Sequence, residues 1–324
     1  MRHIALQAPG GTENMLWRET ALPDPAPGEA QIRHEAIGVN YIDIYHRTGL
    51  YKQPAYPGGL GMEAAGIVEK TGPGVTGLTP GLRVAYVAPQ PGSYATHRNM
   101  PADRLVPLPD WLDGKTAAAL LLQGLTAQYL VHAAARLQSG QSVLLHAAAG
   151  GVGLLLAQWA RQIGATVIGT VGSAEKAAIA QAHGCHHVIN IRAEDCPARI
   201  RALTGGHGVD IVYDSVGKDT FAASLQALKP RGMLVSFGQA SGPVPPFDLA
   251  QLAAGGSLYL TRPSLFHYIA TPEELMRRAA HLFLVLKAGT LRPPPVTSFS
   301  LQDAAKAHQT LESRATTGKL LLIP

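Results

Sequence analysis

Apolar and polar positions follow two different rhythms along this chain, and the change falls near residue 124. Before it, short β-rich runs cover 30–39, 64–70, 83–87 and 93–97, and turns rich in glycine and proline separate them. Short strands interrupted this often by turn residues are typical of a compact β-barrel or sandwich. The pattern therefore predicts a β-rich first domain that precedes, and does not contain, the following unit.

Between 142 and 170 the pattern becomes strand, turn, helix and strand. An apolar β-rich run is followed by small residues, by apolar positions at helical spacing, and by a second β-branched run. The turn reads Ala148-x-Gly150-x-x-Gly153, the dinucleotide fingerprint G-x-G-x-x-G with alanine in its first position. Glycine lets the backbone approach a pyrophosphate, and the N–H groups that open a helix attract anions. We expect Ala149, Gly150, Gly151 and Val152 to bind the cofactor; the alternative is a tight turn built from small residues alone.

Further β-rich runs at 187–191, 209–215, 232–238 and 257–261, with helices between the earlier ones, predict an open parallel sheet. In such a sheet the ligand lies beyond the carboxyl ends of the strands. The residues that follow these ends are therefore expected at the cofactor: Val216, Phe237, Gly238 and Ser241.

The end of the second strand indicates which dinucleotide binds. An NAD site usually has an acidic residue there for the ribose 2′-OH, but the strand continues into Gly172 and Ser173. A small hydroxyl residue followed by Lys176 suits the 2′-phosphate of NADPH better. The alternative is that Ser173 caps a helix and Lys176 is a solvated helix charge.

The last part of the chain returns to a different pattern. Thr271 opens one predicted helix, Ser300 and Asp303 resemble a capping box for another, and 319–323 is a final strand. We expect this tail to pack on the first domain. The predicted organisation is a substrate domain of 1–123 plus 264–324 and a cofactor domain of 124–263, with the active site in the cleft.

Composition excludes several other classes. A length of 324 residues suits two domains, and 46% hydrophobic with 15% charged residues is typical of a soluble globular protein. The formal charge is +5, yet no cluster of Lys and Arg supports nucleic-acid binding, which we consider unlikely. No apolar run could span a bilayer and the start of the chain has no signal-peptide core, so a cytoplasmic location is expected. Two cysteines make no disulfide framework, and the His and Cys residues at 183–187 alternate between the faces of a strand and cannot converge on a metal.

Several segments together resemble one family. The AAAGGVG turn, VDIVYDSVG, GMLVSFGQASG, GSLYLTRPSL and the final ESRATTGKLLLIP resemble the medium-chain dehydrogenase/reductase superfamily, and within it the zinc-independent quinone oxidoreductases that include ζ-crystallin. The resemblance implies an α/β fold in which a Rossmann doubly wound parallel sheet is inserted in a GroES-like β-rich catalytic domain. It also implies metal-free reduction of quinones by NADPH.

The zinc ligands of related alcohol dehydrogenases are absent. Where those enzymes have Cys after Gly-Val and His in Gly-His-Glu, this chain has Asn40 and Met62. An amide and a thioether are poor substitutes for a thiolate and an imidazole. We therefore expect no metal.

By the same resemblance, Asn40 and Thr126 hold the nicotinamide carboxamide, and Tyr45 and Tyr51 line the quinone pocket with Asp43 beside them. The alternative for the two tyrosines is packing between barrel and helix. The resemblance also implies a 2′-phosphate clamp of a Lys, a Tyr on the next strand and a C-terminal Arg. Lys176 and Arg314 match it, whereas Ile191 stands in the Tyr position and cannot donate a hydrogen bond.

Two alternative functions remain. Related zinc-free branches reduce enones or enoyl thioesters with NADPH, which requires a proton donor such as Tyr45 or Tyr51. RNA binding in the same cleft is the other, known for ζ-crystallin relatives. A homodimer is also expected, because 255–261 resembles an edge strand that could pair with its copy across a two-fold axis.

Overall fold

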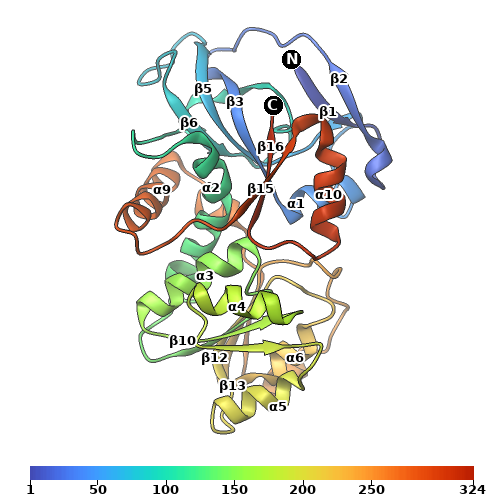
Figure 1. Cartoon of the computed structure of the whole chain (residues 1–324), viewed down its shortest axis with the longest axis vertical. Helices are drawn as coiled ribbons and strands as arrows, with labels where there is room; N and C mark the ends of the chain where they lie inside the picture. The colour runs from blue at the N-terminus through green and yellow to red at the C-terminus, as the bar shows by residue number, and fades with distance from the viewer. The chain divides into compact units, whose positions relative to one another are not determined.

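The computed structural model describes all 324 residues, and their packing divides into two compact units. The first unit comprises Met1–Leu122, Ala270–Ala279 and Pro293–Pro324, and the second comprises Gln123–Ile269 and Ala280–Arg292. The ends of the chain both belong to the first unit (Figure 1). The chain thus forms the β-rich unit first, builds the second unit, and returns.

Two β-sheets form the first unit. The smaller has the order β2-β1-β4 and is antiparallel, and the larger has the order β15-β16-β3-β5-β6-β8, with β7 paired to β3. Its strands have these bounds: β1 Arg2–Leu6, β2 Met15–Glu19, β3 Glu29–Val39, β4 Gly58–Gly59, β5 Glu63–Thr71, β6 Arg83–Val87, β7 His97–Pro101, β8 Val106–Pro107, β15 Val296–Ser300 and β16 Lys319–Ile323.

The register within the larger sheet brings the end of the chain beside its early part. β3 pairs with β5 on one side and with β16 on the other, so that Gly38 lies opposite both Glu63 and Leu321. The predicted final strand at 319–323 is confirmed as β16. The prediction of a strand at 93–97 was wrong. There Ala95 makes only an isolated bridge to His3, and the ladder forms later as β7.

Helices of the first unit begin at recognisable caps. α1 (Tyr41–Thr48) opens with a reciprocal capping box between Asn40 and Asp43 and ends at Gly49, which has a left-handed φ of 82°. Ser300 accepts a hydrogen bond from the Asp303 N–H at the short helix η4 (Leu301–Asp303), ahead of α10 (Ala304–Glu312), as the sequence predicted. The other short helices are η1 Thr12–Asn14 and η2 Ala102–Arg104.

The second unit is an open, parallel, six-stranded sheet. Its order is β11-β10-β9-β12-β13-β14, so that the chain reverses direction across the sheet between β9 and β12. The strands are β9 Ser142–Leu145, β10 Thr166–Val171, β11 His187–Asn190, β12 Val209–Asp214, β13 Leu228–Ser236 and β14 Tyr259–Thr261. This is the predicted doubly wound sheet, and the α/β fold class is confirmed.

Helices cover both faces of this sheet: α3 and α4 lie on one face, and α5 and α6 on the other (Figure 1). Their bounds are α3 Gly151–Ile163, α4 Ala174–Ala182, α5 Cys196–Leu203 and α6 Phe221–Gln226. The remaining helices are α2 Gly114–Tyr129, the π-helical η3 Leu130–Ala134, α7 Ala250–Ala254, α8 Leu265–Tyr268 and α9 Pro272–Lys287. α2 and α9 contribute residues to both units.

Each unit has its own apolar core. In the first, Ile32 and Ile37 of β3 and Leu322 of β16 are fully buried. In the second, Leu144 and Val212 of the neighbouring central strands are fully buried. None of the helices combines the length and the hydropathy needed to cross a lipid bilayer.

Candidate functional site

The turn between β9 and α3 has the geometry of an anion-binding loop. Gly150 is the N-cap of α3, and Leu154 N–H donates to its carbonyl at 2.9 Å. The helix therefore begins with N–H groups that lack intrahelical partners, where the helix dipole also favours an anion. Ala147 has a left-handed φ of 53°, a strained conformation of the kind found at ligand-binding turns.

The glycines of this turn are required by close packing. A Cβ on Gly153 would lie 2.4 Å from the Ala147 carbonyl oxygen, and one on Gly151 would lie 2.2 Å from Oε1 of Gln123. A Cβ on Gly150 would meet only the Ala147 carbonyl oxygen, at 3.2 Å. Gly153 thus lets α3 pack closely on the turn, Gly151 lets it approach Gln123 of α2, and Gly150 leaves the loop open. These residues fit a dinucleotide pyrophosphate.

The carboxyl end of β12 is braced by the buried carboxylate of Asp214. Its Oδ1 accepts hydrogen bonds from the N–H groups of Val216 at 2.8 Å and Gly217 at 3.1 Å. The Thr220 hydroxyl lies 2.9 Å from Oδ1 and 2.8 Å from Oδ2 and donates to the carboxylate. The Ser224 hydroxyl donates to Oδ2 at 2.8 Å. Four donors therefore fix the loop that follows β12.

The same loop gathers the predicted residues from β13. Ser241 donates through its hydroxyl to the Val216 carbonyl at 2.8 Å, and the Phe237 N–H donates to the Asp214 carbonyl at 2.8 Å. A Cβ on Gly238 would lie 2.5 Å from the Ser215 carbonyl oxygen. The structure thus brings Val216, Phe237, Gly238 and Ser241 to one place, beside the reversal point of the sheet.

His146 connects α6 with β10. Its Nε2 lies 3.0 Å from the Ser224 hydroxyl and its Nδ1 lies 3.0 Å from the Thr170 hydroxyl, and burial lowers its pKa. A neutral imidazole can donate to one hydroxyl and accept from the other. Neither Asp214 nor His146 was identified from the sequence. The position of Asp214 at the end of a predicted strand was the available signal.

The end of β10 carries the residues predicted to select NADPH. Ser173 is the N-cap of α4 and accepts from the Lys176 N–H at 3.3 Å, which confirms the capping role considered for it. The Ile191 N–H donates to the Val171 carbonyl at 3.0 Å, and the Ile191 side chain is 49% exposed. Burial lowers the pKa of Lys176, and the nearby charge of Arg192 lowers it further.

In the first unit, Asn40, one of the two positions where the zinc ligands are missing, hydrogen-bonds to a buried ion pair between Glu63 and Lys319. Asn40 donates through Nδ2 to Oε1 of Glu63 at 2.8 Å, and the ammonium of Lys319 donates to Asn40 Oδ1 at 2.7 Å and to the same Glu63 oxygen. Glu63 Oε2 accepts from the Leu122 N–H at 2.8 Å. The positive charge beside Asn40 and Glu63 is thus the Lys319 ammonium group. No group of three His, Cys, Asp or Glu side chains is arranged to hold a metal ion.

Asp43 lies next to this pair at the centre of a second buried network. Its Oδ2 accepts from the Asn40 N–H at 2.8 Å and from the Tyr94 hydroxyl at 3.0 Å, whereas Oδ1 has no hydrogen-bond partner. Burial raises the pKa of Asp43 to about 7, although the Asn40 N–H and the charge of Lys319 act in the opposite direction. A raised pKa means that the protonated form of this carboxyl group persists to a higher pH than in an exposed aspartate.

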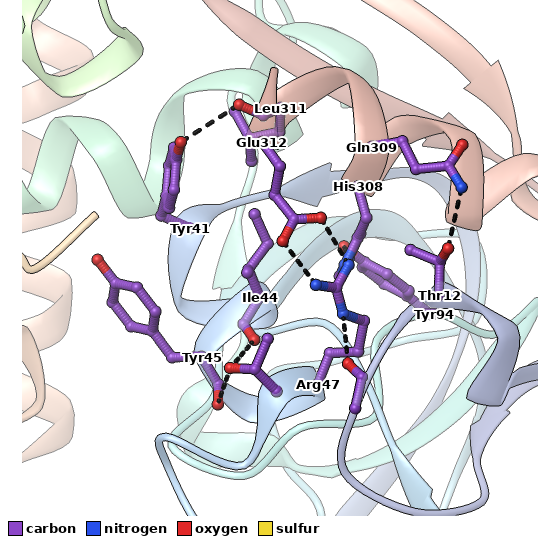
Figure 2. Close-up of polar contacts among 12 residues, drawn as sticks. Thr12, Tyr41, Ile44, Tyr45, Arg47, Tyr94, His308, Gln309, Leu311 and Glu312 are labelled. Atoms are coloured by element: carbon purple, nitrogen blue, oxygen red, sulfur yellow. Dashed lines mark hydrogen bonds and ion pairs between the residues drawn. The ribbon is translucent and has the colours of Figure 1, made fainter. Parts of the chain in front are cut away.

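The network continues from Tyr94 to the surface. The Tyr94 hydroxyl lies 2.9 Å from Nε2 of His308, and Nδ1 of His308 lies 3.5 Å from a guanidinium nitrogen of Arg47. Since Tyr94 donates to Asp43 and Arg47 can only donate, the network assigns the imidazole proton to Nε2. Burial and the Arg47 charge lower the pKa of His308 to about 3. Arg47 itself forms a bidentate pair with Glu312 at 2.6 and 2.8 Å (Figure 2).

The two tyrosines predicted for the substrate pocket are neighbours. Their rings meet edge to face with centroids 5.2 Å apart, and the Tyr51 N–H donates to the Tyr45 carbonyl at 3.0 Å. Tyr45 also lies 6.2 Å from the ring of Tyr41, whose hydroxyl donates to the Leu311 carbonyl (Figure 2). Tyr45 thus lies within α1, two residues after Asp43, and Tyr51 follows the end of the helix.

Arg314 and Thr126, both predicted to bind the cofactor, belong to different units. Arg314 belongs to the first unit, has a left-handed φ of 56°, and hydrogen-bonds the side chain of Tyr41. Thr126 lies in α2 within the second unit and is 8% exposed. The predicted partners of these residues, Lys176 and Asn40 respectively, belong to the other unit in each case.

Comparison with known proteins identifies the same two parts. Residues 26–110 match the alcohol dehydrogenase GroES-like domain, and 151–280 match the zinc-binding dehydrogenase family. A quinone oxidoreductase of Pseudomonas aeruginosa is 46% identical, over 100% of this chain and 99% of that protein. A 2-haloacrylate reductase of a Burkholderia species is 44% identical, over 97% and 96%. The crystal structure of Escherichia coli quinone oxidoreductase complexed with NADPH is 46% identical, covers 100% of both chains and has a TM-score of 0.98.

Proposed function

The chain belongs to the quinone oxidoreductases of the medium-chain dehydrogenase/reductase superfamily, and we propose that it reduces quinones with NADPH and without a metal. The observation that carries the metal-free chemistry is the set of side chains around Asn40. An amide, a thioether and a carboxylate already paired with the Lys319 ammonium do not offer zinc its preferred donors. The loops of the second unit, in contrast, fit NADPH, which supplies a hydride when bound.

We place the cofactor on the second unit. The α3 N-terminus with Ala149, Gly150, Gly151 and Val152 binds the pyrophosphate. The loops held by Asp214 bind the nicotinamide half through the predicted residues Val216, Phe237, Gly238 and Ser241, and Thr126 with Asn40 hold its carboxamide. Gly172, Ser173, Lys176 and Arg314 take the 2′-phosphate, with Ile191 beside them.

We place the quinone at Asn40, Asp43, Tyr45 and Tyr51. A quinone accepts hydride directly because its product oxyanion is delocalised, so the protein has mainly to orient the two reactants and exclude water. Asp43, whose pKa lies about 7, can supply the proton that completes the hydroquinone. The division into a substrate domain (1–123 with 264–324) and a cofactor domain (124–263) and a cytoplasmic location remain proposals.

A second candidate is reduction of an activated carbon–carbon double bond, because a relative of nearly equal identity is a 2-haloacrylate reductase. Hydride addition to such a bond leaves a carbanion that requires a proton, and Tyr45, Tyr51 or Asp43 would donate it. No observation favours RNA binding.

A panel of acceptors tests these two candidates. NADPH oxidation is measured with 1,4-benzoquinone, 9,10-phenanthrenequinone, 2-chloroacrylate and an enone at matched concentrations. Turnover with the two quinones that exceeds turnover with the other two acceptors supports quinone reduction. Activity confined to 2-chloroacrylate or the enone would replace it with double-bond reduction.

We further propose a homodimer through the free edge of the six-stranded sheet. β14 pairs only with β13, and Tyr259 on it is 59% exposed. Strand edges of this kind pair readily with a second copy. Sedimentation of the protein should give a dimer, and Leu260→Pro, which removes a backbone donor at the edge, should give a monomer. A wild-type monomer would contradict this arrangement.

A further inference from the structure

The guanidinium of Arg192 lies near Gly172, directly after the end of β10. Arg192 was not among the residues predicted to bind the cofactor. A Cβ placed on Gly172 would lie 3.7 Å from Nε of Arg192, with no other atom within 4 Å. The guanidinium therefore extends from the loop after β11 across to the end of the neighbouring strand. Gly172 leaves open space on the same side.

A local turn directs Arg192 there. Its N–H donates to Oδ1 of Asn190 at 3.2 Å, an Asx-type turn directly after β11. β11 pairs in parallel with β10, with Asn190 opposite Val171. The residue two positions beyond Asn190 is thus brought to the level of Gly172.

The acidic side chain nearest in sequence is engaged elsewhere. Oε1 of Glu194 accepts from the Asn190 N–H at 2.8 Å, and its other oxygen lies 3.6 Å from Arg199. Arg192 makes no ion pair with a carboxylate of the chain. Its charge instead acts on Lys176, whose pKa it lowers.

Two cations beside one another, close to a serine hydroxyl and an open glycine, form a surface that suits a dianion. The Ser173 oxygen accepts from the Lys176 N–H, which leaves its hydroxyl proton available for donation. A guanidinium recognises phosphate through two parallel N–H donors. Ile191, the residue before Arg192, is exposed but offers no donor.

We propose that Arg192 binds the 2′-phosphate of NADPH together with Lys176 and thereby sets the preference for NADPH over NADH. This inference rests on the proposed NADPH function. The charged contact from Arg192 would take the place of the hydrogen bond that the Ile191 side chain cannot make.

Direct binding of adenosine 2′,5′-bisphosphate and of 5′-AMP, measured by calorimetry on the wild type and on Arg192→Ala, tests the proposal. The first ligand carries the 2′-phosphate and the second does not. Loss of a charge-assisted contact should weaken the bisphosphate about tenfold or more in the variant. Binding of 5′-AMP should change less than about twofold, because its phosphate contacts lie at the α3 N-terminus. In turnover, kcat/KM for NADPH should fall by a similar factor while that for NADH is retained.

Two further variants complete the design. Arg201→Ala, which removes an exposed arginine of α5 and the same net charge, should leave both affinities unchanged. Ile191→Tyr in the Arg192→Ala background should recover part of the lost affinity for the bisphosphate.

The proposal would be overturned if Arg192→Ala weakened the binding of both ligands equally, or if Arg201→Ala had the same effect. Arg192 would then contribute only through the net charge of the protein. Unchanged binding of the bisphosphate would also overturn the proposal. A wild-type protein that binds the two ligands equally would contradict the NADPH assignment itself, and retained discrimination in the variant would contradict only the role of Arg192.

Discussion

Asp43 in the first unit and Asp214 in the second are both buried aspartates, and they differ in the number of hydrogen bonds that their carboxylates accept. Asp43 is 0% exposed and Asp214 is 1% exposed. Four groups donate to the carboxylate of Asp214, two backbone N–H groups and two hydroxyls. Two groups donate to Asp43, both on the same oxygen, and the other oxygen has no partner.

The comparison separates two uses of a buried acid. Desolvation of a carboxylate is offset only where enough donors face it. The donors of Asp214 hold the loop after β12 in one conformation. Asp43 accepts only two hydrogen bonds, and burial raises its pKa to about 7.

The largest expected effect comes from removing the cation that faces Asp43. Lys319→Met leaves Glu63 buried without its partner and removes a charge that favours the ionised form of Asp43. Breaking a buried pair on one side costs about 3–5 kcal/mol. We expect unfolding of the first unit at a correspondingly lower urea concentration. Adding Glu63→Gln should restore part of the loss; a single variant as stable as the wild type would show that the pair contributes little.

Asp214→Asn should have the next largest effect. The amide NH₂ would face groups that are themselves donors, so that at least one buried donor loses its acceptor, at a cost of about 2–3 kcal/mol. The loop after β12 would loosen, and NADPH affinity should fall with it. Urea unfolding and NADPH titration measure the two effects. Ser224→Ala, which removes one of four donors, is the matched control and should cost about 1 kcal/mol.

Unlike the two preceding substitutions, Asp43→Asn should not lower the stability of the protein above neutral pH. The folded-state pKa of Asp43 is raised, so its stabilising contribution is complete below the ordinary value of 3.8 and is lost as the pH rises through about 7. The wild type should lose up to roughly 1.4 kcal/mol per pH unit within this window, and the variant should not. At pH 8 the variant should be at least as stable as the wild type. Parallel pH profiles for the two proteins would contradict the raised pKa.

Tyr94→Phe should give the smallest effect. It removes one donor from Asp43 and the acceptor of His308 Nε2–H, for about 1 kcal/mol of stability. The pKa of Asp43 should rise further, because the lost hydrogen bond lowers it in the wild type. Carbon-13 NMR of the Asp43 carboxyl group measures this shift. A lower pKa in the variant would mean that Tyr94 does not stabilise the ionised form.

Local sequence signals predicted much of the second unit and of the helix caps. The small-residue turn before α3, the glycine after β13 and the cap formed by Ser300 depend on neighbouring residues, and the structure contains each of them. The capping of α4 by Ser173, considered as the alternative to a phosphate contact, is also present. The final strand was predicted with its bounds because its apolar run has a clear beginning and end.

Long-range contacts were beyond the same reasoning. The Glu63–Lys319 pair joins residues 256 positions apart, and the Tyr94–His308 contact joins residues 214 apart, so neither has a local pattern. Arg192 follows Ile191 directly, but its position over Gly172 depends on the register between β10 and β11 and on the Asn190 turn. A pattern of residues could not supply that register.

One measurement tests the central claim that the chain reduces quinones with NADPH and without a metal. The protein is stripped of metal by dialysis against chelator, and oxidation of NADPH and of NADH by 1,4-benzoquinone is followed before and after zinc is restored. We expect turnover to be unchanged by chelator and by zinc, and kcat/KM to be higher with NADPH. Activity that disappears with chelator and returns with zinc would contradict the account, since Asn40 and Met62 would then have to be part of a metal site.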